Sequence, residues 1–414
     1  MQISVEISDK IEYNEGNKHK PAAMSRQKRG NAMENYNPLL VGNDSPAKFI
    51  TIGEVMLRLT PPNYEKIRMA TSFEASYGGS EANIALALAN LGVDSTFFSV
   101  VPNNSLGKSA VRWLRSNDVH CTPMILSTPE ETPTHRLGTY YLETGYGIRP
   151  SKVTYDRKHS AFTEYDLTKV DVDALLEGYD WLHLSGITPA LCDNCAYFVL
   201  RCLEAAKKKG LTVSFDGNFR SSLWTWEEAR DFCTKCLPYV DVLFGIEPYH
   251  LWKDENDHSQ GDWKDGVPLQ PSYEQQDEVF QHFIERYPNI KCLARHVRYA
   301  HSGSENSLKA FMWYEGHTFE SKLFTFTILD RVGGGDAFAS GLIYAMLHNY
   351  SCLLYTSGGA MRTKNELYQE TMRTVAARRQ MARARAEDAR AEAEAAIPAP
   401  VSYTHLDVYK RQGG

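Results

Sequence analysis

The sequence predicts an α/β fold in which a doubly wound, mainly parallel sheet carries helices on both faces, with a small β lid beside it. Apolar strand-like segments alternate with amphipathic helical segments from residue 49 to residue 347. The strand-like segments are apolar along their whole length, which is typical of parallel strands that crossover helices cover on both faces.

The expected strands of the main sheet are six apolar runs, at residues 49–59, 95–101, 181–187, 211–218, 240–246 and 290–297. Apolar residues recur every three or four positions in the expected helices, at 80–92, 105–117, 273–287 and 335–347. Segments 61–77 and 134–157 instead alternate polar and apolar residues, which predicts the short strands of the lid.

Composition changes on both sides of this region. Residues 1–47 are a polar leader, and Met33 is a candidate start that would make the residues before it non-native. Residues 352–357 (CLLYTS) and 407–412 (DVYKRQ) can be encoded by the two strands of one short DNA and resemble translated sequencing-adapter sequence. We therefore expect one domain over 48–350, truncated at its C-terminal end, and a non-native tail over 351–414. The Ala/Arg/Glu-rich helix of that tail is typical of a coiled-coil fragment, with a basic binding helix as the alternative.

Charge and hydropathy narrow the class of protein. The 414 residues include 45 basic and 51 acidic side chains, a net charge of −6. This balance gives no basic surface for nucleic acid and no cationic face for a membrane. No apolar run approaches the ~20 residues of a membrane span, and the polar, acidic start does not resemble a secretory signal. A cytoplasmic enzyme is the expectation.

The eight cysteines include two C-x-x-C pairs, Cys192/Cys195 and Cys233/Cys236. Two such pairs could together ligate zinc. Each pair, however, lies in a segment of helical periodicity without a glycine-rich knuckle. We therefore expect both to pack as small apolar side chains, and we assign no metal ligand directly.

The segment DRVGGGDAF at 330–338 carries the strongest chemical signal. Gly333, Gly334 and Gly335 precede an amphipathic helix, so their bare N–H groups and the helix dipole can form an anion site. Asp336 places a carboxylate beside that anion, which suits phosphoryl transfer with the aspartate as proton acceptor. The alternative is a glycine-rich turn with a capping aspartate, and no Gly-Lys-Ser/Thr follows that would make this a P-loop.

A second glycine motif, YGGSEAN at 77–83, opens the first expected helix. Gly78 and Gly79 permit close approach of a polyol, and Asn83 offers it both a donor and an acceptor. Alone, a Gly-Gly pair before a helix is often only a turn.

Together the two motifs resemble the two signatures of the PfkB (ribokinase-like) family of carbohydrate kinases, with the resemblance covering about residues 49–350. It implies that Asp336 is the catalytic base, that Gly333, Gly334 and Gly335 form the anion hole, and that ATP and Mg²⁺ are required. Arg331, where Thr is more usual, is similar to the 2-keto-3-deoxygluconate kinase branch. Relatives often pair their lids, so the resemblance also implies a homo-oligomer.

The resemblance also implies a sugar site, made of Gly78, Gly79, Asn83, Tyr140, Tyr155, Arg157, Ile187 and Arg220. Each has an ordinary alternative, because tyrosines commonly pack on a sheet and exposed arginines are commonly solvated. Two arginines, Arg157 and Arg220, nevertheless favour an acidic sugar over a neutral one.

Two positions depart from the family pattern. The family's N-x-x-E is replaced by IEPY at 246–249, so Glu247 is the carboxylate left for the magnesium–phosphate site. Arg295 stands where a lysine often meets the nucleotide phosphates. The implied function is ATP-dependent phosphorylation of 2-keto-3-deoxygluconate to its 6-phosphate. The alternatives are a fructokinase or other PfkB sugar kinase, and a catalytically impaired truncated chimera.

Overall fold

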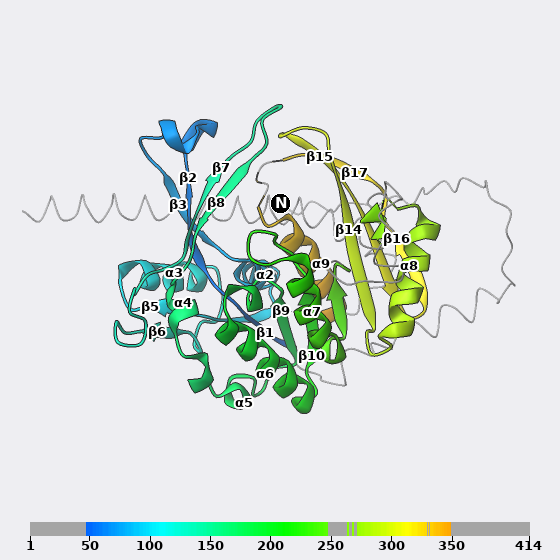
Figure 1. Cartoon of the computed structure of the whole chain (residues 1–414), viewed down its shortest axis with the longest axis horizontal. Helices are drawn as coiled ribbons and strands as arrows, with labels where there is room; N and C mark the ends of the chain where they lie inside the picture. Colours follow the sequence, from blue (N-terminus) through cyan, green and yellow to red (C-terminus); the bar gives the residue numbers. More distant parts are fainter. Residues whose placement is uncertain are drawn as a thin grey trace, which may run out of the picture. The chain divides into compact units, whose positions relative to one another are not determined.

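The computed structural model describes residues 47–246, 263–264, 267–268, 271–328, 330 and 332–348. Within this part, helices cover both faces of a main sheet and a smaller sheet stands away from it (Figure 1). The expected leader before residue 47 and the expected tail over 351–414 lie outside the described residues.

The main sheet has the strand order β16-β15-β14-β11-β10-β9-β1-β4, with β17 paired to β15. Its strands are β1 (Lys48–Ile52), β4 (Asp94–Phe98), β9 (Trp181–Ser185), β10 (Thr212–Asp216), β11 (Val242–Phe244), β14 (Cys292–Ala300), β15 (Glu305–Tyr314), β16 (His317–Glu320) and β17 (Phe324–Thr327). All pairs from β4 to β14 are parallel, and the three pairs of β15 are antiparallel. The expected mainly parallel sheet is confirmed, with an added antiparallel edge.

The helices begin and end at recognisable signals. They are α2 (Ser80–Asn90), α3 (Ser105–Arg115), α4 (Ala161–Glu164), α5 (Val172–Leu175), α6 (Asp193–Lys209), α7 (Trp226–Cys236), α8 (Tyr273–Arg286) and α9 (Gly334–Leu347). Thr225 with Glu228, and Ser272 with Gln275, form capping boxes ahead of α7 and α8. Gly210 ends α6 in the left-handed conformation, at φ 75°. No helix in the described part is both long and apolar enough to cross a bilayer.

Two apolar clusters hold the helices on the two faces of the sheet. Leu182 and Leu243 belong to the cluster that packs against α6, α7 and α8, whereas Trp181 and Val242 belong to the cluster that packs against α2 and α9. Sequence neighbours fall in different clusters because successive side chains of a strand point to opposite faces. Strands that must be apolar on both faces explain the continuous apolar runs of the sequence.

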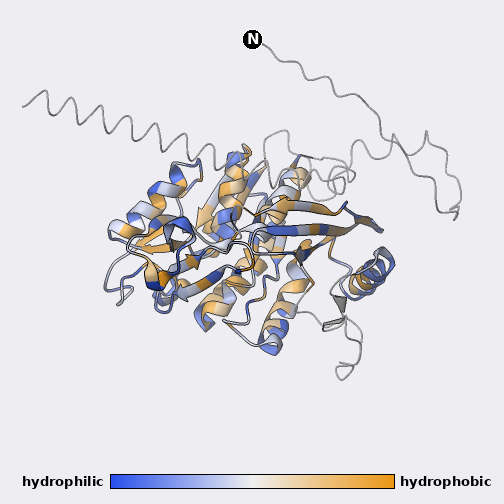
Figure 2. Ribbon diagram, turned by 90° about the horizontal axis from the view of Figure 1, so that it is seen from above, coloured by the Kyte–Doolittle hydropathy of each residue, from blue (hydrophilic) through white to orange (hydrophobic). Residues whose placement is uncertain are grey.

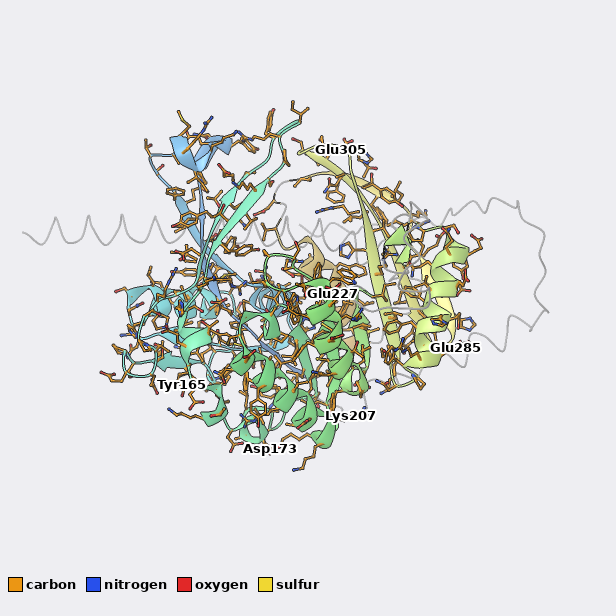
Figure 3. All side chains as sticks on the ribbon, viewed as in Figure 1. Tyr165, Asp173, Lys207, Glu227, Glu285 and Glu305 are labelled. Carbon is orange, nitrogen blue, oxygen red and sulfur yellow. The ribbon has the colours of Figure 1, made fainter. Side chains whose placement is uncertain are left out.

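Polar residues lie on the outer sides of the helices, around the apolar interior (Figure 2). Lys207 of α6 and Glu285 of α8, both labelled in Figure 3, are exposed. The amphipathic patterns of these segments therefore mark which side of each helix meets the sheet.

The lid is a four-stranded sheet with the order β3-β2-β7-β8. Its strands are β2 (Met56–Thr60), β3 (Glu74–Gly78), β7 (Thr139–Glu143) and β8 (Lys152–Asp156). Two further short pairs lie elsewhere in the described residues: β5 (Val100–Pro102) with β6 (Ile125–Ser127), and β12 (Trp263–Lys264) with β13 (Val267–Pro268).

The expectation of one strand over 49–59 is wrong. The chain leaves the main sheet at Gly53 and continues as β2 of the lid. Gly53 packs so closely on α2 that a Cβ there would lie 2.5 Å from the carboxyl carbon of Glu81. Apolar residues resume at Val55 after Glu54, so the sequence pattern does not mark the point where β1 ends and β2 begins. The expected strand at 95–101 is likewise divided, into β4 and β5.

Candidate active site

The candidate site lies at the carboxyl ends of the parallel strands. Gly53, Gly186 and Gly217 follow β1, β9 and β10, and their N–H groups donate to the carbonyls of Phe98 (3.2 Å), Asp216 (2.8 Å) and Phe244 (3.0 Å). A Cβ at Gly186 would lie 2.3 Å from the carbonyl oxygen of Gly217, so the two loops meet only because this residue is glycine. Open α/β sheets bind their ligands at this edge.

Asp336 lies in the first turn of α9 and is buried. The helix begins after Gly333, which adopts a left-handed φ of 81° and lacks a side-chain cap. The first amides of a helix have no partner within the helix, so they point their N–H groups outward beside Asp336. Ser80 Oγ donates to Asp336 Oδ1 at 2.8 Å, and Asn83 Nδ2 donates to Oδ2 at 2.7 Å. The two glycine-led helix starts, of α2 and α9, therefore meet at one carboxylate.

A third segment completes this hydrogen-bond network. Asn218 Nδ2 donates to Ser80 Oγ at 2.8 Å, which directs the hydroxyl proton of Ser80 toward Asp336. Asn218 takes a left-handed φ of 39°, and its N–H donates to Asp216 Oδ1 at 2.9 Å. Asparagine tolerates this conformation better than most residues. The D-G-N turn after β10 thus fixes the donor that orients Ser80.

Two further carboxyl groups, those of Asp216 and Glu81, lie next to this network. Burial, and secondly the charge of Asp336, raise the pKa of Asp216 to about 7, while Arg220 opposes the shift. Burial also raises the pKa of Glu81, whose Oε1 accepts from Ser185 Oγ (2.6 Å) and Thr188 Oγ1 (2.8 Å). Asp216 can therefore change its protonation state near neutral pH, next to Asp336.

The lid places three of the expected sugar-site residues close together. Tyr140 is buried, which raises its pKa to about 12, and a Cβ at Gly78 would lie 2.8 Å from its Oη. The exposed ring of Tyr155 lies 5.9 Å from the ring of Tyr140, and Arg157 lies over it at 5.7 Å. Gly78, at the end of β3, therefore leaves room for the hydroxyl of Tyr140 next to the start of α2.

Arg157 forms an ion pair with Glu54, whose Oε2 accepts from Arg157 Nε at 2.8 Å. The two side chains are only 10% and 2% exposed. Glu54 follows β1 in the segment that passes from the main sheet to the lid. The binding of a sugar acid by Arg157, expected from the sequence, stays a prediction.

The lid also contacts the far side of the site. Arg58 Nη1 of β2 lies 2.5 Å from Asp330 Oδ2, just before the glycine-rich turn. At the tip of the β7–β8 hairpin, the Gly303 N–H donates to the Gly147 carbonyl (2.6 Å), and the Gly147 N–H donates to Ser304 Oγ (2.9 Å). The lid hairpin thus reaches the turn between β14 and β15 (Figure 1).

Ile187 and Arg220 lie on the loops after β9 and β10. Ile187 is partly buried, and its N–H donates to Ser185 Oγ at 3.2 Å. Arg220 is exposed, and its guanidinium donates to the Phe219 carbonyl at 3.0 Å. Both are on the edge that carries Asp336, although their contacts with a substrate stay predictions. Glu247 lies outside the described residues.

Arg295 is not brought to the glycine-rich turn. It is buried in β14 and donates to Gln276 of α8 at 2.8 Å, on the same side of the strand as Leu293, which packs in the α8 cluster. His296 takes the other side. Its ring lies 5.2 Å from Phe338 of α9, and a Cβ at Gly335 would lie 3.7 Å from its Cε1. The side chain of β14 that faces the turn is therefore His296, because side chains alternate along a strand.

The C-x-x-C pairs are not gathered into one site. Cys192 and Cys195 lie at the start of α6, and Cys233 and Cys236 lie on α7. Among the residues that the structure describes, no group of three or more His, Cys, Asp or Glu side chains is arranged to hold a metal ion.

Sequence reasoning did not single out Ser80, Asn218 or Glu54. Ser80 stands inside the YGGSEAN motif, and Asn218 follows Gly217 in the D-G-N turn after β10. A polar residue beside a glycine that opens a helix or a turn is therefore the signal that could have found them. His296 and Glu54 carry no comparable signal, because their roles depend on strand alternation and on a distant partner.

The arrangement is suited to one chemical task. A carboxylate with both oxygens fixed stands beside helix amides that can bind an anion. Such a pair can accept the proton of a hydroxyl while negative charge collects on a neighbouring phosphoryl group.

Comparison with known proteins agrees with this geometry. The model of the pfkB family carbohydrate kinases matches residues 46–248. The chain is 32% identical over 301 residues to the 2-dehydro-3-deoxygalactonokinase of Haloferax volcanii, covering 73% of this chain and 85% of that protein.

Two solved structures show the same architecture. The 2-dehydro-3-deoxygluconokinase of Thermotoga maritima aligns with a TM-score of 0.69 and 34% identity, over 77% of this chain and 93% of that one. A putative ribokinase II from E. coli, solved with ATP and Mg²⁺, aligns with a TM-score of 0.58 and 18% identity, over 79% and 99% of the two chains. The second likeness is one of fold, which is ribokinase-like.

Proposed function

The chain belongs to the PfkB family of carbohydrate kinases, and on that premise we propose that it phosphorylates the terminal hydroxyl of a 2-keto-3-deoxy sugar acid, using ATP. The first candidate substrate is 2-keto-3-deoxygluconate, with its 6-phosphate as the product. The observation that carries the proposal is Asp336, held between Ser80 and Asn83 at the glycine-rich start of α9. The catalytic domain in this proposal spans residues 48–350.

Asp336 acts as the general base in this proposal. Its two oxygens accept hydrogen bonds from Ser80 and Asn83, and such bonds stabilise the charged form of a carboxylate. The fixed carboxylate then accepts the proton of the sugar hydroxyl as that oxygen bonds to phosphorus. General bases of this kind typically contribute ~10²–10⁴-fold to the rate.

The start of α9 supplies the anion hole. Gly333 turns the chain in a conformation that is unfavourable for other residues, and the N–H groups of Gly334 and Gly335 follow in the first helical turn. Amides fixed in this way offset the charge that develops on the phosphoryl oxygens, without having to reorganise during the reaction.

The residues present are suited to a bound nucleotide phosphate. ATP would supply the phosphoryl group, and Mg²⁺ would offset the charge of its phosphates. Magnesium usually keeps several waters and takes one or two carboxylates together with phosphate oxygens, so it does not require a cluster made only of protein side chains. We assign none of the described residues as its ligand.

The choice of a sugar acid rests on arginine. Arg220 is an exposed residue of the loop after β10, and its charge opposes the rise in the pKa of Asp216. Arg157, paired with Glu54, stands where the lid meets the main sheet. A guanidinium suits a carboxylate because it can donate two parallel hydrogen bonds. The Haloferax relative favours a second candidate, 2-keto-3-deoxygalactonate, which differs from the first only in configuration at one carbon.

A substrate panel tests the proposal. The purified full chain is incubated with ATP, Mg²⁺ and one of three sugars: 2-keto-3-deoxygluconate, 2-keto-3-deoxygalactonate or fructose. ADP release is followed in a coupled assay, and the product is identified by phosphorus NMR. We expect the highest kcat/KM for one of the two acids, with phosphate on the terminal oxygen. A preference for fructose, or no release above the background without sugar, would overturn the proposal.

A further inference from the structure

We propose that Cys192 and Cys195 form a redox pair. A low-molecular-weight disulfide oxidises the two thiols reversibly to an intramolecular disulfide, and this disulfide weakens sugar binding at the neighbouring site. The pair stands where the short 3₁₀ turn η4 (Pro189–Leu191) runs into α6. The second half of the proposal, on sugar binding, rests on the proposed function.

The geometry of the two thiols is close to that of a disulfide. Their Sγ atoms lie 3.2 Å apart, and the Cys195 N–H donates to Cys192 Sγ at 3.4 Å. Cys192 is the N-cap of α6 and Cys195 lies in its first turn. Because a disulfide bond is about 2.05 Å long, the sulfurs need to approach by only about 1 Å.

The two thiols differ in the way that an attacking and a resolving cysteine differ. Cys192 is partly exposed, and the hydrogen bond with the Cys195 thiol lowers its pKa to about 7. Cys195 is buried, and the same hydrogen bond, together with burial, raises its pKa well above the ordinary value. Thiolate character and access both favour Cys192 as the nucleophile.

The second C-x-x-C pair of the chain provides a contrast. Cys233 and Cys236 have the same spacing, but both are fully buried in the apolar cluster beneath α7. They lie in the second half of that helix and not at its start, and burial raises the pKa of Cys236. Spacing alone therefore does not define the redox pair, which depends on its position at a helix start.

The reaction is thiol–disulfide exchange. The Cys192 thiolate attacks one sulfur of glutathione disulfide, forms a mixed disulfide and releases one glutathione thiolate. The Cys195 thiol then loses its proton to solvent and attacks the Cys192 sulfur, which releases the second glutathione. Two electrons pass from the protein to glutathione, and reduced glutathione in excess reverses both steps.

The pair is joined to the candidate site by the segment before it. Ser185 and Thr188, upstream of η4, both donate to Glu81, which directly follows Ser80 in α2. The Glu54–Arg157 ion pair is close enough to Cys195 to influence the pKa of that thiol. Closing the disulfide shifts the start of α6, which follows the Ser185–Thr188 segment and η4 along the chain. We therefore expect sugar KM to rise more than kcat changes.

The chemical half is tested without any kinase assay. The reduced full chain is equilibrated in buffers with increasing ratios of oxidised to reduced glutathione. It is then alkylated and digested with trypsin, and the peptide masses are measured by mass spectrometry. Cys192 and Cys195 share the tryptic peptide 170–201. We expect this peptide to lose two hydrogens, while Cys233 and Cys236 stay alkylated. Alkylation of both Cys192 and Cys195 in every buffer would overturn the proposal.

Variants separate the two roles. In Cys195→Ala the mixed disulfide cannot be resolved, so glutathione should stay attached to Cys192. Cys192→Ser should abolish oxidation of the peptide. Cys202→Ala, which removes a fully buried thiol from the same helix, should behave like the parent chain. Equal glutathione attachment in Cys195→Ala and the parent would contradict the assignment of Cys195 as the resolving thiol.

Activity is measured last, on the oxidised and reduced forms of the parent and of Cys192→Ser. A higher sugar KM in the oxidised parent alone supports the coupling to the site, and equal KM values overturn it. If no sugar is phosphorylated by the reduced parent, the proposed function fails while the mass measurement still decides the redox pair.

Discussion

Asn83 and Asp336 are 253 positions apart in the sequence, and the amide nitrogen of one lies 2.7 Å from a carboxylate oxygen of the other. Ser80 occupies the second oxygen, so α2 fixes the carboxylate of α9 at two points. The two glycine motifs of the chain are therefore in direct contact: the second carries Asp336, and the first holds both of its carboxylate oxygens.

Removing either donor should impair turnover without unfolding the protein. A hydrogen bond to a charged group contributes about 1.5–3 kcal/mol, so we expect Ser80→Ala and Asn83→Ala each to lower kcat roughly 10–100-fold. Because both bonds favour the charged carboxylate, the acid limb of the pH–rate profile should move to higher pH. Ser105→Ala, at the matching exposed position of α3, is the control. An unchanged kcat and pH profile would remove these residues from the account.

The Arg157–Glu54 pair should be required for stability. In Arg157→Ala, Glu54 is left as an unpaired buried charge, which costs about 3–5 kcal/mol. We expect a clear fall in Tm, and its partial recovery in the double variant Glu54→Gln/Arg157→Met. Arg136→Ala, which breaks a more exposed lid pair with Asp156, should cost less than about 1 kcal/mol. Similar Tm changes in Arg157→Ala and Arg136→Ala would show that burial of the Arg157–Glu54 pair does not increase its contribution to stability.

Asp216 should make the folded state less stable as pH rises. Burial, and then the charge of Asp336, raise its folded pKa to about 7, whereas an unfolded aspartate titrates near about 3.9. Between these values the folded state binds more protons, so the free energy of unfolding falls with rising pH. Asp216→Asn removes this effect, and its Tm should gain on the parent from pH 4 to pH 7. Asp231→Asn, at an exposed position of α7, is the control and should show no such trend. If the plots of Tm against pH were parallel for Asp216→Asn and the parent, the raised pKa of Asp216 would be refuted.

Arg220→Ala should weaken a sugar acid more than a neutral sugar. The lost charge-assisted bond contributes roughly 1.5–3 kcal/mol, which predicts a rise of about 10–150-fold in KM for 2-keto-3-deoxygluconate. Fructose, which has no carboxylate, should be affected little. The exposed Arg112→Ala on α3 is the matched control. Equal increases for the acid and for fructose would exclude a carboxylate contact.

The fold was predictable because burial on both faces of a parallel sheet leaves continuous apolar runs in the sequence. The break at Gly53 was not predictable, since apolar residues resume at Val55 after the single charged residue Glu54. The course of the chain into the lid becomes visible only in the pairing of β2 with β3 and β7. The antiparallel edge was also not foreseen, because β15 and β16 carry mixed polar and apolar residues.

Asp336 could be identified as a candidate because three glycines mark its helix start. Its partners could not be assigned, since Ser80 and Asn218 meet only when the loop after β10 folds against α2. The orientations of Arg295 and His296 could not be predicted either, because the sequence of β14 does not indicate which of its two faces packs against α9. Helix starts are local features of the sequence, whereas these contacts are long-range.

The most direct test of the central claim compares Asp336→Asn with the parent chain, with turnover and sugar affinity measured on the same preparations. The account predicts a fall of ~10²–10⁴-fold in kcat, with sugar binding and Tm nearly unchanged. This result would place Asp336 in the transfer step and not in affinity or folding. Turnover by Asp336→Asn within about threefold of the parent would contradict the assignment of Asp336 as the base.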